Sequence, residues 1–205
     1  MNLFPKQIPI FPLSGVIYFP KTNLPLNIFE QRYLDLVNDS FRKDKFMGMI
    51  QAKRTGQEIY NVGCLGKIND LQKSEDGRIL INLTGITRFE IIEEQTNKKL
   101  YREFKVEYKK FSSDLDPTID DVNIVSLMEK VKNFFKRNGL LLNWKELEKL
   151  EKTQRINTLA MISPVTNEEK QKLLESISLK EKVKTLEDII DFYFHEVNFK
   201  SRTIQ

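Results

Sequence analysis

The sequence IPIFPLSGVIYFPKTNLPLNIFEQRYLDLV, residues 8–37, decides the fold of the first half of the chain. Its four prolines separate short runs of aliphatic and aromatic residues. Because proline lacks an N–H and has a fixed φ, it is confined to strand edges, strand ends and corners. The runs at 8–11, 16–19 and 24–28 are therefore predicted to be short strands joined by sharp corners.

The hydrophobic period changes after the last of these runs. Phe29, Tyr33, Leu36 and Val37 recur at three- and four-residue steps, which is helical spacing. The pattern predicts a helix of about three turns that follows the opening strands.

The motifs in this stretch are similar to those of a known family, the N-terminal domain of the Lon proteases. The resemblance rests on segments that together span nearly the whole chain: PIFPL at 9–13, FP at 19–20, LPLNIFEQRY at 24–33, VG at 62–63, DG at 76–77, GITRF at 85–89 and EKQKLLE at 169–175. It implies a partly open β-barrel related to the PUA fold, followed by helices.

The remaining residues of the first half predict further strands. Extended runs lie at 46–51, 62–71, 78–84, 87–94 and 101–111, with Gly85 predicted to break one of them. Asp76-Gly77 predicts a hairpin turn. Several short strands separated by turns are typical of a barrel or sandwich.

The second half of the chain reads as helical, and 1–113 and 114–205 are predicted to be separate subdomains. Asp116-Pro117 predicts a helix start, and Asn138-Gly139 predicts its end. Asn143 is predicted to cap a second helix that ends at Pro164. Capping-box patterns at 166–169 and 178–181 begin two more helices. The fold class is therefore α+β: an N-terminal PUA-like, partly open β-barrel with one helix, followed by a C-terminal helical bundle.

Composition favours an ordinary globular protein over a disordered or membrane-spanning one. The 205 residues are 40% hydrophobic and 30% charged, with a net charge of +4. No apolar run approaches the ~20 residues needed to cross a bilayer, and the start of the chain does not read as a secretory signal. We therefore expect a cytoplasmic protein without a membrane partner.

The sequence offers little catalytic chemistry. GCLGKI at 63–68 lacks the spacing and the hydroxyl of a phosphate-binding P-loop. One cysteine, Cys64, and one histidine, His195, cannot supply the usual zinc ligands. Cys64 is predicted to be a small core residue and His195 a helix-surface residue. The prediction is a protein that is not an enzyme, works without ATP and holds no metal or cofactor.

Nine residues lie in the segments that match the family, and their roles are expected to be architectural: Pro12, Phe29, Glu30, Arg32, Tyr33, Gly63, Gly85, Arg88 and Phe89. Among the charged ones, Glu30 is expected to share hydrogen bonds with an arginine, because buried charges are usually paired. This network would link the first helix to the barrel.

The resemblance implies a function as well as a fold. Lon N-terminal domains help to select unfolded or damaged polypeptide, so the chain is predicted to be a stand-alone, non-catalytic module that binds polypeptide clients or a protein partner. A PUA-like RNA-binding protein is the alternative, since the net charge is positive, although no strand carries an obvious row of basic and aromatic residues. The sequence leaves the oligomeric state open.

Overall fold

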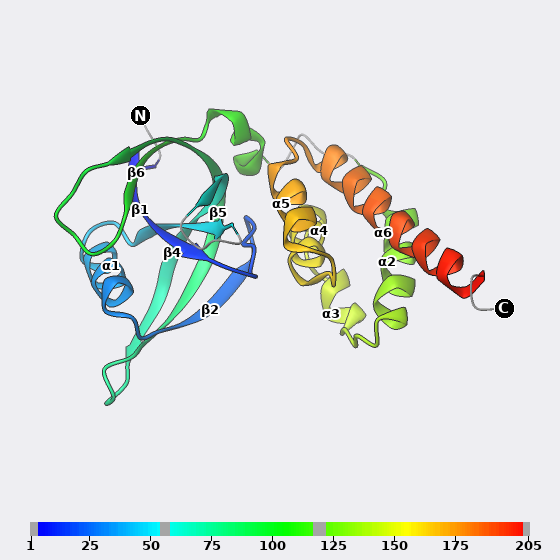
Figure 1. Ribbon diagram of the computed structural model, residues 1–205, viewed down its shortest axis with the longest axis horizontal. Helices are drawn as coiled ribbons and strands as arrows, with labels where there is room; N and C mark the ends of the chain where they lie inside the picture. The colour runs from blue at the N-terminus through cyan, green and yellow to red at the C-terminus, as the bar shows by residue number, and fades with distance from the viewer. Residues whose placement is uncertain (1–3, 54–57, 117–121, 203–205) are drawn as a thin grey trace. The chain divides into compact units, whose positions relative to one another are not determined.

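The computed structural model describes residues 4–53, 58–116 and 122–202, the last seven of these by backbone alone. The chain divides into two compact units, Met1–Asp116 and Pro117–Gln205. Figure 1 shows a ring of strands in the first unit and a group of helices in the second. Asp114, just before the end of the first unit, forms an ion pair with Arg88 in the barrel.

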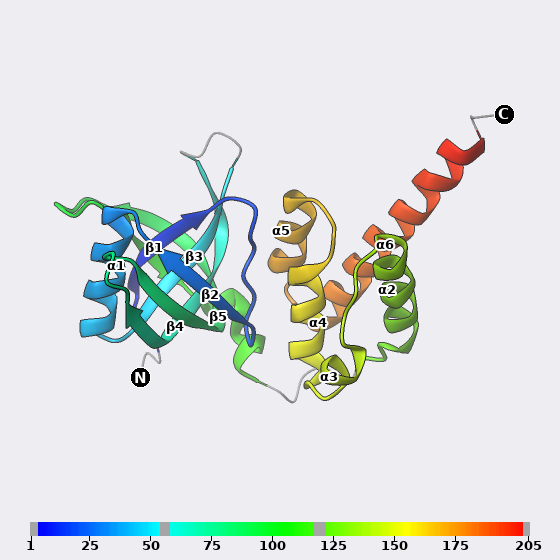
Figure 2. The same cartoon turned by 90° about the horizontal axis from the view of Figure 1, so that it is seen from below.

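The first unit is a six-stranded sheet that curls toward a ring (Figure 2). The strand order is β2-β5-β4-β3-β1-β6, and β5 pairs with β6 as well, which brings the sheet round on itself. All pairs are antiparallel except β1 with β3. The strands are β1 (Gln7–Leu13), β2 (Asn23–Ile28), β3 (Phe46–Ala52), β4 (Ile59–Lys73), β5 (Ile79–Gln95) and β6 (Glu103–Glu107).

β5 is continuous through Gly85, so the predicted break there is wrong. Gly85 instead allows another part of the backbone to approach, since a Cβ at this position would lie 2.2 Å from the Phe19 carbonyl oxygen. The Gly85 N–H donates to the Thr22 carbonyl at 2.9 Å, and the Lys21 N–H donates to the Gly85 carbonyl at 2.8 Å. These bonds fix the end of the loop that contains residues 16–19, which is not the predicted strand; within it Ile17, Tyr18 and Phe19 are buried and Val16 is exposed.

The barrel interior is filled by inward-facing side chains from several strands. One buried cluster there contains Ile8, Ile10, Ile50, Leu65, Phe89, Phe104 and Val106. Gly63 makes room for the Phe89 ring, because a Cβ there would lie 2.5 Å from Cζ of Phe89. The helix α1 (Gln31–Arg42) packs Tyr33, Leu36 and Val37 inward, as its period predicts. A short 3₁₀ helix, η1 (Lys109–Leu115), completes this unit.

The second unit consists of helices joined by short turns. They are α2 (Val125–Arg137), α3 (Trp144–Glu148), α4 (Lys152–Ile162), α5 (Asn167–Glu175) and α6 (Leu179–Arg202). Residues 122–124 are not helical and 117–121 lie outside the described residues, so the helix expected from Asp116 begins only at Val125.

The helix predicted between Asn143 and Pro164 is two helices. Glu151 has extended backbone angles (φ −56°, ψ 152°) and separates α3 from α4. The Arg155 guanidinium donates to the Leu150 carbonyl at 3.0 Å and also to the Glu148 carbonyl. These bonds satisfy carbonyl groups that the end of α3 leaves open, so the break costs little.

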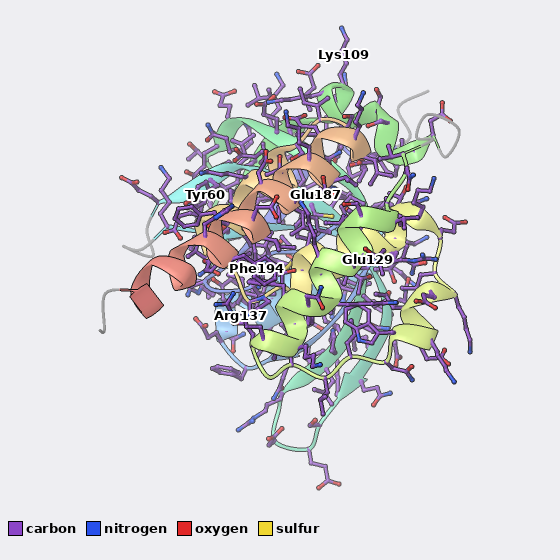
Figure 3. All side chains as sticks on the ribbon, turned by 90° about the vertical axis from the view of Figure 1, so that its right-hand side faces the viewer. Tyr60, Lys109, Glu129, Arg137, Glu187 and Phe194 are labelled. Carbon is purple, nitrogen blue, oxygen red and sulfur yellow. The ribbon has the colours of Figure 1, made fainter. Side chains whose placement is uncertain are left out.

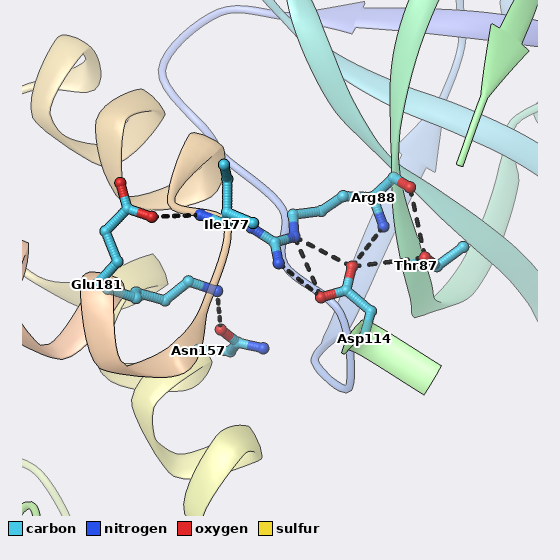
Figure 4. Close-up of polar contacts among 7 residues, drawn as sticks. Thr87, Arg88, Asp114, Asn157, Ile177 and Glu181 are labelled. Carbon is cyan, nitrogen blue, oxygen red and sulfur yellow. Dashed lines mark hydrogen bonds and ion pairs between the residues drawn. The ribbon is translucent and has the colours of Figure 1, made fainter. Parts of the chain in front are cut away.

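Side-chain caps begin several of these helices. The Asn143 side chain accepts from the Glu146 N–H at 3.3 Å, and Thr166 forms a complete capping box with Glu169. Ser178 accepts from the Glu181 N–H, while the Glu181 carboxylate accepts from the Ile177 N–H at 2.8 Å (Figure 4).

The longest helix contributes an apolar stripe to the core of the helical unit. Leu179, Val183, Leu186 and Ile190 of α6 are buried, as are Leu127, Val131 and Phe134 of α2. α2 and α6 lie side by side in Figure 3, where the Arg137 guanidinium lies 5.4 Å from the centre of the Phe194 ring. None of the helices in the described residues combines the length and the apolar character that crossing a bilayer requires.

Candidate binding groove on the barrel

The barrel wall is open between β1 and β2. β5 pairs with β2 through residues 79–84 and with β6 through residues 90–95, so both strands lie on one side of β5. β6 in turn pairs with β1 only as far as Pro9, and the last bond on that side joins the Ile10 N–H to the Arg102 carbonyl. Within the described strands, the end of β1 and the whole of β2 therefore lack a partner on the sides that border this opening.

A groove of about 690 Å³ occupies the opening. β1 contributes Phe11, Pro12 and Leu13 to its lining, and β2 contributes Leu26, Asn27 and Ile28. Apolar residues predominate, with a few polar groups among them, which is typical of sites that bind organic ligands or peptides. The groove belongs entirely to the first unit.

Two stacked rings line one part of the groove. The Phe11 and Tyr33 ring centres are 4.1 Å apart with an interplanar angle of 28°. The Arg32 guanidinium lies 4.5 Å from the centre of the Tyr33 ring, which is a cation–π contact. Burial raises the pKa of Tyr33, against the lowering effect of Arg32, so the ring remains a neutral phenol at physiological pH.

Phe29 is the most exposed aromatic residue of the groove, with 65% of its surface accessible. It follows Ile28, which points into the core, and precedes Glu30, which has extended angles at the N-cap of α1. The alternation of a strand therefore turns Phe29 outward. Phe29 therefore presents an exposed aromatic ring beside the groove.

Two ion pairs lie among the polar residues around the groove. Arg32 donates to the Glu30 carboxylate at 2.8 Å, with both side chains about half exposed. Arg102, from the residue before β6, pairs with Glu94 at 2.7 Å. The hydrogen bond from Arg102 lowers the pKa of Glu94 from its ordinary value of 4.5. Each positive charge is thus balanced by a neighbouring carboxylate.

Arg88 lies elsewhere and forms a buried ion pair with Asp114 (Figure 4). The two side chains are 2% and 7% exposed, and their shortest N–O distance is 2.7 Å. Asp114 also accepts from the Arg88 backbone N–H at 2.8 Å, and the guanidinium lies 4.3 Å from the Phe111 ring centre. This pair fastens η1 to β5, which is an architectural role.

The nine motif residues therefore separate into two groups. Pro12, Phe29, Glu30, Arg32 and Tyr33 all line the groove, although the sequence favours architectural roles for them. Gly63, Gly85, Arg88 and Phe89 lie in the barrel wall and its core.

Sequence reasoning missed other groove residues. Arg102 reaches the groove only because β6 pairs with β1, a register that no local pattern specifies. Leu26 lies in a predicted strand, but this strand is too short for its sequence to show which side is buried. Asp114 was likewise not recognised as the partner of Arg88.

No constellation of catalytic or metal-binding groups stands out among the described residues. Cys64 is fully buried, and His195 is exposed on α6. In the same part of the chain, no three His, Cys, Asp or Glu side chains are grouped so that they could hold a metal ion. The groove offers surface for contact and no evident nucleophile–base pair.

Comparison with known proteins gives a consistent result. Residues 7–191 match the family model described as the ATP-dependent protease La (LON) substrate-binding domain. The chain is 26% identical over 203 residues to the Lon protease of Syntrophus aciditrophicus and 28% identical over 135 residues to that of Cytophaga hutchinsonii. These alignments cover 91% and 63% of this chain, but only 25% and 16% of the relatives, so the chain spans a quarter or less of their length.

Solved structures agree on the fold. The Lon N-terminal domain protein of Xanthomonas campestris superposes with a TM-score of 0.64 at 21% identity, covering 88% of this chain and 96% of that one. The N-terminal domain of the Mycobacterium avium complex Lon protease gives 0.63 at 17% identity, covering 91% and 98%. The matched region is the N-terminal substrate-binding domain, and neither the protease nor the ATPase domain is part of the match.

Proposed function

Because this chain belongs to the family of the ATP-dependent protease La (LON) substrate-binding domain, we propose that it is a non-catalytic module that binds unfolded polypeptide in the groove between β1 and β2. The observation that carries the proposal is the exposed Phe29 ring beside an apolar groove in an open barrel wall. Unfolded chains differ from folded ones in exposing their apolar side chains, and this surface is suited to contact with such side chains.

Side-chain contacts are expected to provide most of the binding. Pro12 on β1 and Pro25 on β2 have no N–H, so neither edge can offer a full row of donors to an added strand. Apolar contact with Phe29, Leu26 and the Phe11–Tyr33 pair depends little on the sequence of the client. Weak and broadly selective binding is the expected result, as is appropriate for recognition of misfolded proteins.

The test compares two matched variants in binding to a reduced, carboxymethylated polypeptide that cannot fold. Phe29→Ser removes the exposed ring in the groove, and Ile92→Ser removes an apolar side chain that is 52% exposed on β5, away from the groove. We expect Phe29→Ser to weaken binding about ten- to a hundredfold, since burying an aromatic ring contributes roughly 1.5–3 kcal/mol, and Ile92→Ser to leave it nearly unchanged. Equal effects of the two substitutions, or no binding by the unsubstituted protein, would contradict the proposal.

The same preparation can be offered a single-stranded oligoribonucleotide to address the alternative function. RNA binding depends on phosphate contacts, so its affinity falls steeply as salt rises, whereas apolar polypeptide binding does not. The family match gives no support to RNA as the ligand. Salt-sensitive RNA binding that is stronger than polypeptide binding would reverse this assignment.

A further inference from the structure

The connection between α2 and α3 carries apolar side chains that are exposed and do not pack in the core of the helical unit; we call it the tip. Its sequence is KRNGLLLNWK, residues 136–145. Leu141 is fully exposed, at 101% of its reference surface, and Leu140 is 39% exposed. In Figure 1 the connection turns at the end of α2, at the lower margin of the helical unit. Exposing two neighbouring leucines to water is unfavourable, so a pair of this kind is a candidate contact site.

The exposure of these leucines is built into the backbone. Gly139 has φ +68°, and its N–H donates to the Lys136 carbonyl at 3.1 Å, while the Leu140 N–H donates to the Phe135 carbonyl at 3.0 Å. Asn143 then caps α3. Trp144 is held by the Phe135 ring, with centres 5.8 Å apart. A left-handed glycine at one end and a helix cap at the other hold the leucines outward in a defined turn.

Basic residues flank this tip on both sides in the sequence. Lys136, Arg137 and Lys145 flank the leucines in sequence. The carboxylates that follow the tip in sequence are paired with other lysines, because Glu146 pairs with Lys149 at 2.6 Å and Glu148 pairs with Lys132 at 3.0 Å. The surplus charge next to the leucines is therefore positive, and it is complementary to a negatively charged partner.

From this arrangement we propose that the α2–α3 connection is a docking tip for an anionic lipid surface, in which Leu140 and Leu141 enter the apolar layer and the flanking basic side chains bind headgroups. Projecting apolar residues, an adjacent tryptophan and basic flanks are the features that bind proteins to membrane interfaces. A bilayer accepts a projecting side chain without a matching pocket, whereas a protein partner would have to supply one. The sequence-based expectation of no membrane partner rested on the lack of a spanning segment, which does not bear on a surface contact.

The tip contains its own reporter, because Trp144 is the single tryptophan of the chain. The experiment titrates the full chain with phosphatidylcholine vesicles that contain 30% phosphatidylglycerol or none, while the emission of Trp144 is recorded and vesicle flotation is measured in parallel. We expect a blue shift and flotation with the anionic vesicles only, both reversed by high salt. A protein that ignores the anionic vesicles, or binds neutral ones equally well, would overturn the proposal.

Three variants locate the contact. L140S/L141S is expected to weaken partition about tenfold or more, because each buried methylene contributes ~0.8 kcal/mol. K136Q/K145Q is expected to weaken it about 25-fold, at roughly fivefold for each basic residue near an anionic surface. Val125→Ser, at a position that is 65% exposed at the other end of α2, is the control and should bind unchanged. Equal loss in the control, or full binding by L140S/L141S, would refute the assignment.

A protein partner is the competing occupant. An acidic amphipathic helical peptide added without lipid serves as its probe, again with Trp144 as the reporter. A shift with this peptide, lost in L140S/L141S and accompanied by no vesicle binding, would assign the tip to a protein and overturn the lipid proposal. This inference does not depend on the groove of the barrel, so Phe29→Ser should leave vesicle binding intact.

Discussion

The buried ion pair between Arg88 and Asp114 should dominate the attachment of η1 to the barrel. Asp114→Ala removes the carboxylate and leaves a guanidinium that is 2% exposed, together with the Arg88 backbone N–H, without this acceptor. Breaking a buried pair by removing one partner costs about 3–5 kcal/mol, because the remaining buried charge loses its opposite charge. We therefore expect the free energy of opening of β5 to fall by about 3–5 kcal/mol.

Native-state amide hydrogen exchange of β5 is a suitable measurement, because it reports on the barrel separately from the helical unit. The matched control is Glu90→Ala on the same strand. Glu90 pairs with Lys110 of η1 at 3.0 Å, but its side chain is 36% exposed and that of Lys110 is 40% exposed. An exposed pair contributes about 0–1 kcal/mol, so the control should lose less than that. If Asp114→Ala loses no more than Glu90→Ala, the argument from burial is wrong.

Three further predictions follow from single contacts. Gly85→Ala should destabilise the barrel by about 1–3 kcal/mol, because its Cβ would lie 2.2 Å from the Phe19 carbonyl oxygen, and an unchanged melting temperature would show that the loop yields freely. Thr166→Ala should cost the helical unit about 1 kcal/mol in urea unfolding followed by Trp144 emission, since it removes the capping box of α5, and a loss below ~0.3 kcal/mol would contradict this. The pKa of Glu94, measured by carboxyl NMR, should lie below 4.5 and rise toward it in Arg102→Gln. Since this pKa is lowered on folding, the pair stabilises the protein at neutral pH and the contribution is lost as pH falls through the folded pKa; a pKa that does not respond to Arg102→Gln would refute the assignment.

Much of the fold could be predicted from local patterns. Residues 24–28 and the apolar steps from Phe29 to Val37 predicted β2 and α1, and the capping patterns at Thr166 and Ser178 predicted the starts of α5 and α6. These features depend on neighbours in sequence, so the sequence shows them directly. No local pattern determines that the strands form a barrel, so this prediction came from the family-specific motifs. The similar solved structures confirm the fold.

The errors have a common physical origin in contacts between distant residues. Residues 16–19 have strand composition but form a loop, and the backbone bonds to Gly85 are made just after them, by the Lys21 N–H and the Thr22 carbonyl. The break at Glu151 is stabilised by Arg155, whose side chain satisfies the open carbonyls. The groove could not be foreseen for the same reason, because it exists only where β1 and β2 fail to meet after the sheet has curled.

The order of the strands around the sheet has a consequence for synthesis on the ribosome. β4 and β5 form a local hairpin, but β5 is also the only described strand that pairs with β2, and it emerges long after β2 does. The backbone N–H and C=O groups of the nascent N-terminal strands therefore stay unpaired until β5 has been synthesised. At this stage polypeptides tend to associate wrongly. Pro12 and Pro25 interrupt the rows of N–H donors on these edges, so the prolines that limit strand addition to the finished barrel also protect the unfinished chain from its neighbours on a polysome.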